Sequence, residues 1–337
     1  MKLILHIGSA KTGTSTLQKT LRTQEDALVA QGVLYPRTGF SPVDNQSSIA
    51  LEAITRGVPR IFEQNGPLSA ADVTEMYEAS WRNITAEIAK TSPHTVVLSS
   101  EFLFLTQDTA NLDPMLTRIG ALFDEVEVAC YLRSPESFYA SKSLQILRGA
   151  TRLPRPGKFS YLGVLDSYKA YFPTRARVYA RDALIDGDIV QDFLTCFLPG
   201  VTLEPVADEA NISISAEGMY VAAEIRKRFM NLPENKFTPE HTRLIRKIGR
   251  VEETLGIKKK PKLRPWVLKE LYGFFEPERQ AIEEIYDVRF PPVAFNGDLE
   301  RRPGSDLPIR QVFALDDTQI ENIMMRLAYA DTVHEAK

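Results

Sequence analysis

The stretch that decides the fold is residues 2–21, KLILHIGSAKTGTSTLQKTL. Four of its first six residues, 3–5 and 7, are apolar, and the run is short enough for one buried strand. Residues 8–13 follow as a turn that is bounded by glycines, and residues 16–21 continue as a helix with Leu17 and Leu21 on one face. A strand, a glycine-bounded loop and a helix in this order open a phosphate-binding α/β domain.

Three later apolar runs read as further strands, at residues 95–99, 126–132 and 176–180. Helical patterns at residues 71–90 and 113–123 separate them. Alternating strands and helices predict an α/β fold with a three-layer α/β/α core and a mostly parallel sheet. In such sheets ligands gather at the carboxyl ends of the strands. We therefore expect the loop, Glu101 and Arg133 to meet, since each follows a strand.

The chain becomes mainly helical from about residue 211. Helices are expected at residues 219–230, 278–288 and 317–329, with a proline-rich loop at 291–308. The sequence thus predicts a core over residues 1–210. Residues 211–337 are expected to form a helical C-terminal extension packed on that core as part of one domain.

A basic stretch lies within this C-terminal region. Residues 241–264 carry nine Lys or Arg against two Glu. Two interpretations stay open: a solvated helical face followed by a loop, or a mobile basic flap that closes over a nucleotide or steers a polyanionic acceptor.

Composition excludes several classes of protein. Of the 337 residues, 44% are hydrophobic and 25% charged, which argues against a disordered or fibrous chain. The net charge of −3 gives no basic field for nucleic acid. Cys130 and Cys196 each lie among apolar residues, which favours a reducing compartment. The apolar start is too short for a signal peptide or a membrane span, so we expect a cytoplasmic protein.

The loop differs from a nucleoside-triphosphate loop in the position of its lysine. In the pattern G-x-x-x-x-G-K-[ST] the lysine follows the second glycine. Here Thr14 follows Gly13, and Lys11 lies inside the loop. Backbone N–H groups, a helix N-terminus and the hydroxyls of residues 14–16 can still bind an anion.

Residues 11–17, KTGTSTL, resemble the 5′-phosphosulfate loop K-x-G-T-[ST]-x-L of the sulfotransferases that use 3′-phosphoadenosine 5′-phosphosulfate (PAPS). The resemblance implies a P-loop-like fold in which Lys11 contacts the oxygen between phosphate and sulfate. It also implies that the loop residues hold the 5′-phosphate, namely Thr12, Gly13, Thr14, Ser15 and Thr16.

A second element of the same family is similar to residues 131–141, YLRSPESFYAS. The resemblance implies that Arg133 and Ser141 bind the 3′-phosphate, and a guanidinium suits a dianionic phosphate. Weaker similarity extends over residues 1–230, with Gln145 matching bacterial glycan-modifying relatives.

The implied reaction moves a sulfuryl group from PAPS to a hydroxyl, less readily an amine, of a carbohydrate or glycolipid. It leaves 3′,5′-adenosine diphosphate and is expected to need no metal. A general base must take the acceptor proton. Glu101 is one candidate, although it also suits a carboxylate that stabilises a helix N-terminus. His6 is the other, and it equally suits a hydrogen-bonded core histidine.

Two other classes of function stay open. One is a nucleoside-triphosphate enzyme such as a small-molecule kinase, against which stand the absent lysine after Gly13 and the absence of a clear Asp-ended strand for Mg²⁺. The other is a non-catalytic nucleotide-binding module, which would need Arg133 and Ser141 but neither Lys11 nor Glu101.

Overall fold

The strand β1 (Lys2–His6) lies in the middle of a five-stranded parallel sheet with the order β2-β3-β1-β4-β6. The structure is a computed structural model that describes residues 1–40, 45–53, 62, 67–105, 109–206, 214–258 and 260–334. The other strands of the sheet are β2 (Val33–Leu34), β3 (Thr95–Ser99), β4 (Glu125–Leu132) and β6 (Thr174–Val178). The four predicted strands are confirmed, although β6 begins and ends two residues earlier than expected.

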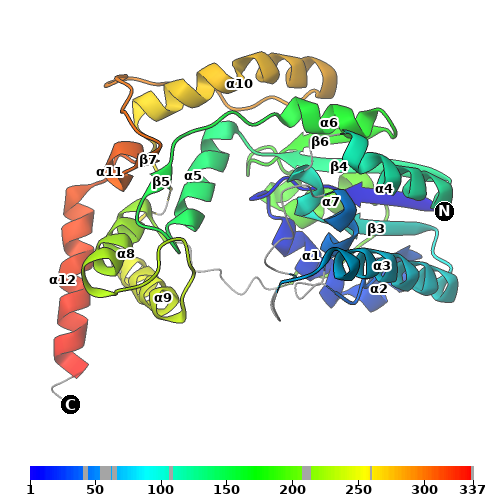
Figure 1. Cartoon of the computed structure of the whole chain (residues 1–337), viewed down its shortest axis with the longest axis horizontal. Helices are drawn as coiled ribbons and strands as arrows, with labels where there is room; N and C mark the ends of the chain where they lie inside the picture. Colours follow the sequence, from blue (N-terminus) through cyan, green and yellow to red (C-terminus); the bar gives the residue numbers. More distant parts are fainter. Residues whose placement is uncertain are drawn as a thin grey trace. The chain divides into compact units, whose positions relative to one another are not determined.

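Both faces of the sheet are buried, because side chains alternate along each strand. On β1, Leu3, Leu5 and Ile7 belong to one core cluster, whereas Ile4 belongs to a second cluster on the opposite face. The first face is covered by α3 (Ala70–Thr91), α4 (Thr109–Leu122) and α6 (Tyr161–Lys169), together with the 3₁₀ helix η1 (Ser47–Ala53). The second is covered by α1 (Thr14–Thr23), α2 (Glu25–Ala30) and α7 (Ile189–Phe197). Figure 1 shows these helices around the sheet, which confirms the predicted three-layer α/β/α arrangement.

Side-chain caps fix where several helices begin. The hydroxyl of Ser69 accepts from the backbone N–H of Asp72, whose carboxylate accepts in return from the N–H of Ser69, so α3 begins with a capping box. The carboxylate of Asp188 accepts from the N–H groups of Val190 and Gln191 and caps α7.

The described residues form two units. The first comprises Met1–Ser134, Phe159–Ala207 and Pro277–Phe290, and it contains the sheet. The second comprises Pro135–Lys158, Asp208–Glu276 and Pro291–Lys337. The predicted boundary at residues 210–211 falls within residues 207–213, outside the described part of the chain. The chain also passes between the units at four other points, which the sequence did not indicate.

The second unit is mainly helical. Its core packs α8 (Ala216–Phe229), α9 (Pro239–Thr254) and α12 (Asp317–His334) against one another (Figure 1). Its other elements are α5 (Pro135–Ile146), the first part of α10 (Pro265–Tyr286), α11 (Ile309–Val312) and a small antiparallel pair of β5 (Leu153–Pro154) with β7 (Asp306–Leu307). The helix expected at residues 278–288 therefore begins much earlier, at Pro265. Within the described ranges, no helix is long and apolar enough to cross a lipid bilayer.

Candidate functional site

The loop between β1 and α1 has a backbone suited to anion binding. Gly8, Lys11 and Gly13 have positive φ angles of 103°, 66° and 73°. Gly13 is the N-cap residue of α1, and within the described chain no side chain caps this helix. The first N–H groups of α1 therefore keep the partial positive charge of a helix N-terminus at the edge of the sheet.

Hydroxyl groups hold the loop together from within. The hydroxyls of Thr12 and Thr14 donate to the carbonyl oxygen of Ser9 at 2.5 Å and 3.2 Å. The hydroxyl and the N–H of Ser9 both donate to the carbonyl oxygen of Tyr131, at 3.0 Å and 2.9 Å. Ser9, Thr12 and Thr14 are buried, whereas Ser15 is exposed and Thr16 half-buried. Of the expected phosphate-binding hydroxyls, those of Ser15 and Thr16 are therefore the accessible ones.

Arg133 meets the loop as the sequence predicts. It follows β4, and its Nη1 donates to the carbonyl oxygen of Lys11 at 3.0 Å. The hydroxyl of Tyr161 donates to the carbonyl oxygen of Arg133 at 2.9 Å, which fixes the backbone on the other side. Burial lowers the pKa of Arg133 from its usual value, and the guanidinium remains a cation at physiological pH.

Glu101 also meets the loop, as expected from its place after β3. A Cβ atom on Gly8 would lie only 3.2 Å from the Cα of Glu101, so the two backbones are in close contact. Glu101 begins the 3₁₀ helix η3 (Glu101–Leu105). Burial raises the pKa of the Glu101 carboxyl, and the nearby charge of Lys11 opposes that rise. The structure thus brings together a half-buried lysine, a carboxylate with a raised pKa and an uncapped helix.

Tyr179 is a site residue that the sequence did not single out. A Cβ atom on Gly13 would lie 3.0 Å from its ring and 3.1 Å from its hydroxyl oxygen. The guanidinium carbon of Arg133 lies 6.0 Å from the centre of the same ring. Tyr179 comes directly after β6, so an aromatic residue at a strand's carboxyl end was the signal that could have identified it.

His6 is part of a buried hydrogen-bond network beneath the loop. Its Nδ1 lies 2.8 Å from the hydroxyl of Ser99, to which the amide of Gln18 also donates at 3.0 Å. The ring is 1% exposed and packs edge-on against Phe193, with 5.7 Å between ring centres. Desolvation lowers the pKa of His6 to about 3, so the imidazole is neutral at physiological pH. Neither Ser99 nor Gln18 was recognised in the sequence as a partner of this histidine.

Ser141 and the basic stretch belong to the second unit. Ser141 is half-buried on α5. The stretch at residues 243–264 comprises most of α9 and the segment that leads into α10, and Lys259 lies outside the described residues. Arg133 belongs to the first unit and Ser141 to the second, so their expected pairing stays a prediction.

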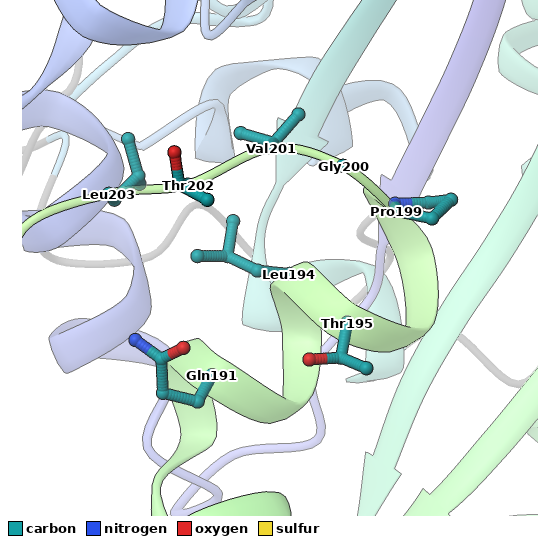
Figure 2. Close-up of a pocket in the computed structure, with 8 residues that line it drawn as sticks. All are labelled: Gln191, Leu194, Thr195, Pro199, Gly200, Val201, Thr202 and Leu203. Atoms are coloured by element: carbon teal, nitrogen blue, oxygen red, sulfur yellow. The ribbon is translucent and has the colours of Figure 1, made fainter.

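A pocket of about 360 Å³ lies elsewhere on the first unit, at the end of α7 and along the segment that follows it (Figure 2). None of the predicted site residues lines it, and none of its lining residues is charged. The lining residues are Gln191, Leu194, Thr195, Pro199, Gly200, Val201, Thr202 and Leu203. The described part of the chain also contains no group of three or more His, Cys, Asp or Glu side chains that could hold a metal ion.

The arrangement at the loop combines backbone N–H groups suited to an anion, one lysine, one arginine and one carboxylate with a raised pKa at the same edge of the sheet. In comparisons with known proteins, no family model, no curated protein and no solved structure matches this chain.

Proposed function

We propose that the chain is a PAPS-dependent sulfotransferase with a P-loop-like site at residues 8–16. The observation that carries this proposal is that Lys11 interacts with the residues that follow two other strands, Arg133 after β4 and Glu101 after β3. Arg133 donates to the carbonyl of Lys11, and the charge of Lys11 acts on the carboxyl of Glu101. A lysine, a positioning arginine and a base candidate therefore surround the same anion-binding loop.

The residues present fit a phosphosulfate group. The N-terminus of α1 lacks a side-chain cap, so its N–H groups can bind a 5′-phosphate without displacing a hydrogen bond from a capping side chain. The hydroxyls of Ser15 and Thr16 are accessible at the same helix end. Arg133, whose guanidinium lies near the ring of Tyr179, would hold the 3′-phosphate.

PAPS supplies an activated sulfuryl group that is transferred in line to the acceptor. The chain's own contribution is to position the groups and to stabilise charge where it develops. Lys11 would donate to the oxygen that becomes negative as the bond to sulfur breaks. Removing one such donor from an enzyme typically costs about 3 kcal/mol, or about a hundredfold in rate.

Glu101 is the base that we propose. A general base works best when its pKa is close to the working pH, and burial moves the pKa of Glu101 in that direction. The imidazole of His6 is neutral at physiological pH, as a base must be. However, its ring is buried and its Nδ1 is already within hydrogen-bond distance of the Ser99 hydroxyl. We therefore propose that Glu101 accepts the proton of the acceptor hydroxyl and that His6 has a structural role.

The competing proposal, a nucleoside-triphosphate enzyme, is less well supported. The position after Gly13, where such a loop carries its lysine, holds Thr14, whose side chain is buried and donates to Ser9. No cation therefore follows the second glycine.

The two cysteines, Cys130 and Cys196, are both free thiols, in keeping with the cytoplasmic protein that we propose.

The acceptor that we propose is a hydroxyl of a carbohydrate or glycolipid, with an amine as the less favoured choice. Incubation with PAPS and a panel of oligosaccharides tests the proposal directly. The expected result is a sulfated product formed in equal amount with 3′,5′-adenosine diphosphate. Release of the bisphosphate without any sulfated product would reduce the activity to PAPS hydrolysis.

A further inference from the structure

An ordered tip between α8 and α9 carries two exposed phenylalanines. We define the α8–α9 tip as residues 227–238, which are the last turn of α8 and the connection to α9. Phe229 is 80% exposed and Phe237 is 65% exposed. Large apolar patches that a protein leaves exposed mark interaction sites, and these two rings lie within one short stretch of chain.

Hydrogen bonds from the buried Arg226 hold the backbone of the tip. Arg226 is buried on α8, and its Nη2 donates to the carbonyl oxygens of Pro233 at 2.5 Å and Lys236 at 3.1 Å. Its Nη1 lies 3.1 Å from Nδ1 of His241, near the start of α9, so the guanidinium joins the two helices at this end. The backbone of the tip is therefore fixed, and its phenylalanines are exposed by the fold.

The segment before β5, at residues 149–151, also contacts the tip. The N–H of Thr151 donates to the carboxylate of Glu234 at 2.6 Å. A Cβ atom on Gly149 would lie 3.1 Å from the carbonyl carbon of Lys236, so the two backbones are closely packed. These contacts occupy the polar groups of the connection and leave the rings of Phe229 and Phe237 toward solvent.

The sequence around the two phenylalanines is rich in basic residues. Residues 224–250 contain eight Lys or Arg and three Glu, in a chain whose net charge is −3. Lys227, Arg228 and Lys236 are exposed within the tip. On α9, the exposed Arg243, Arg246 and Arg250 recur at intervals of three and four residues, so they share one helix face. Two of these cations have acidic neighbours: Arg228 with Glu224 at 2.8 Å and Arg243 with Glu240 at 3.8 Å.

We propose that the α8–α9 tip binds an anionic lipid surface. Exposed aromatic rings partition into the headgroup region of a bilayer, and basic residues beside them are attracted to anionic lipids. A soluble polyanion would be recognised by the charges alone, and the exposed phenylalanines favour the lipid surface. The proposal concerns the second unit only and does not depend on the activity of the loop.

Cosedimentation of the full chain with vesicles tests this inference. The vesicles are phosphatidylcholine alone, or phosphatidylcholine and phosphatidylglycerol in equal parts. We expect binding to the second kind only, weakened at high salt because the charges are at the surface. The double variant Phe229→Ser and Phe237→Ser should bind at least about tenfold more weakly, since it loses two apolar side chains. Replacing Lys227, Arg228 and Lys236 with Gln should weaken binding about fivefold for each charge that is not already neutralised.

A matched control is Met325→Ser on α12, because Met325 is also 65% exposed but lies outside the tip. This variant should bind as the unaltered chain does, and circular dichroism should show that all variants are folded. Two results would overturn the proposal: no binding to the phosphatidylglycerol vesicles, or undiminished binding by the phenylalanine variant. If the chain binds no vesicles but is retained on heparin, the partner is a soluble polyanion.

Discussion

The guanidinium of Arg133, at the end of β4, donates from Nη1 to the carbonyl oxygen of Lys11 at 3.0 Å. Lys11 has a left-handed backbone, with φ of 66°, and it is the one cation of the loop at residues 8–16. An arginine that is distant in sequence therefore holds the peptide whose side chain we propose to act on the leaving oxygen. The left-handed conformation costs energy for a lysine, and the hydrogen bond from Arg133 helps to offset that cost.

Replacement of Arg133 separates loop positioning from nucleotide binding. If Arg133 binds the 3′-phosphate, Arg133→Ala should weaken binding of 3′,5′-adenosine diphosphate by about tenfold to a hundredfold, which is the range for a charge-assisted hydrogen bond. Binding of adenosine 5′-monophosphate, which has no 3′-phosphate, should change much less. Calorimetric titration with both nucleotides measures the difference. An equal loss for both would limit Arg133 to holding the loop.

Lys11→Ala should lower kcat about a hundredfold, because the variant loses the donor to the charged leaving oxygen. Its melting temperature should change little, since the side chain is only half-buried. Lys19→Ala is the matched control, because Lys19 is an exposed lysine on the neighbouring α1. Initial-rate assays of both variants test the assignment, which fails if Lys11→Ala keeps the rate of the control.

Glu101 should produce an acid limb in the pH–rate profile. Burial raises its pKa, so the limb should lie above the ordinary range of a glutamate. The rate should fall as the pH drops through that pKa, because the protonated carboxyl cannot accept the acceptor's proton. Glu101→Gln should remove the limb and lower kcat by at least about a hundredfold, whereas Glu101→Asp keeps a carboxylate and the limb. Profiles of kcat against pH for the three proteins show whether Glu101 causes the acid limb. An unchanged limb in Glu101→Gln would mean that another group causes it.

Gly13→Ala should disrupt the loop. The added methyl group would lie 3.0 Å from the ring of Tyr179 and 3.2 Å from Ile189, on a backbone with φ of 73°. The left-handed conformation alone costs an alanine about 1 to 2 kcal/mol. Thermal denaturation measures the cost, and Gly157→Ala is the control because nothing lies within 4 Å of its added atom. Equal stability of the two variants would contradict the close contact of Gly13 with Tyr179.

His6 should make the protein less stable in mild acid. The folded pKa of about 3 lies below the ordinary value near 6.5, so the folded state resists the proton that the unfolded state accepts. The contribution to stability is complete above the ordinary pKa and is lost as the pH falls below it. From about pH 7.5 to about pH 5 the loss amounts to about 2 kcal/mol. Urea denaturation at both pH values should show that His6→Asn lacks this part of the change; an identical pH dependence in the variant would contradict the burial of His6.

The central strands and their helices could be predicted because both faces of the sheet are buried, which leaves short runs rich in apolar residues in the sequence. β2 was missed because Val33–Leu34 is only two residues long and lies at an edge of the sheet. β6, the opposite edge, is only partly buried, and its apolar pattern therefore gave a position two residues late.

Only those site residues that directly follow a strand could be predicted to lie together. Glu101 and Arg133 come directly after strands, so topology alone brings them to the loop. The sequence could not distinguish the inward hydroxyls of Thr12 and Thr14 from the accessible ones of Ser15 and Thr16, because all four are small polar residues in one run. Nor could it pair His6 with Ser99, since that contact depends on the parallel register of β1 with β3.

The central claim is that the loop at residues 8–16 binds the phosphosulfate of PAPS rather than a nucleoside triphosphate. The shift in melting temperature with 3′,5′-adenosine diphosphate, compared with ATP and Mg²⁺, tests it most directly. A ligand at about a hundred times its dissociation constant stabilises the folded chain by about 2.7 kcal/mol. We predict that the bisphosphate raises the melting temperature and that ATP with Mg²⁺ does not. A rise with ATP and Mg²⁺ but none with the bisphosphate would contradict the account.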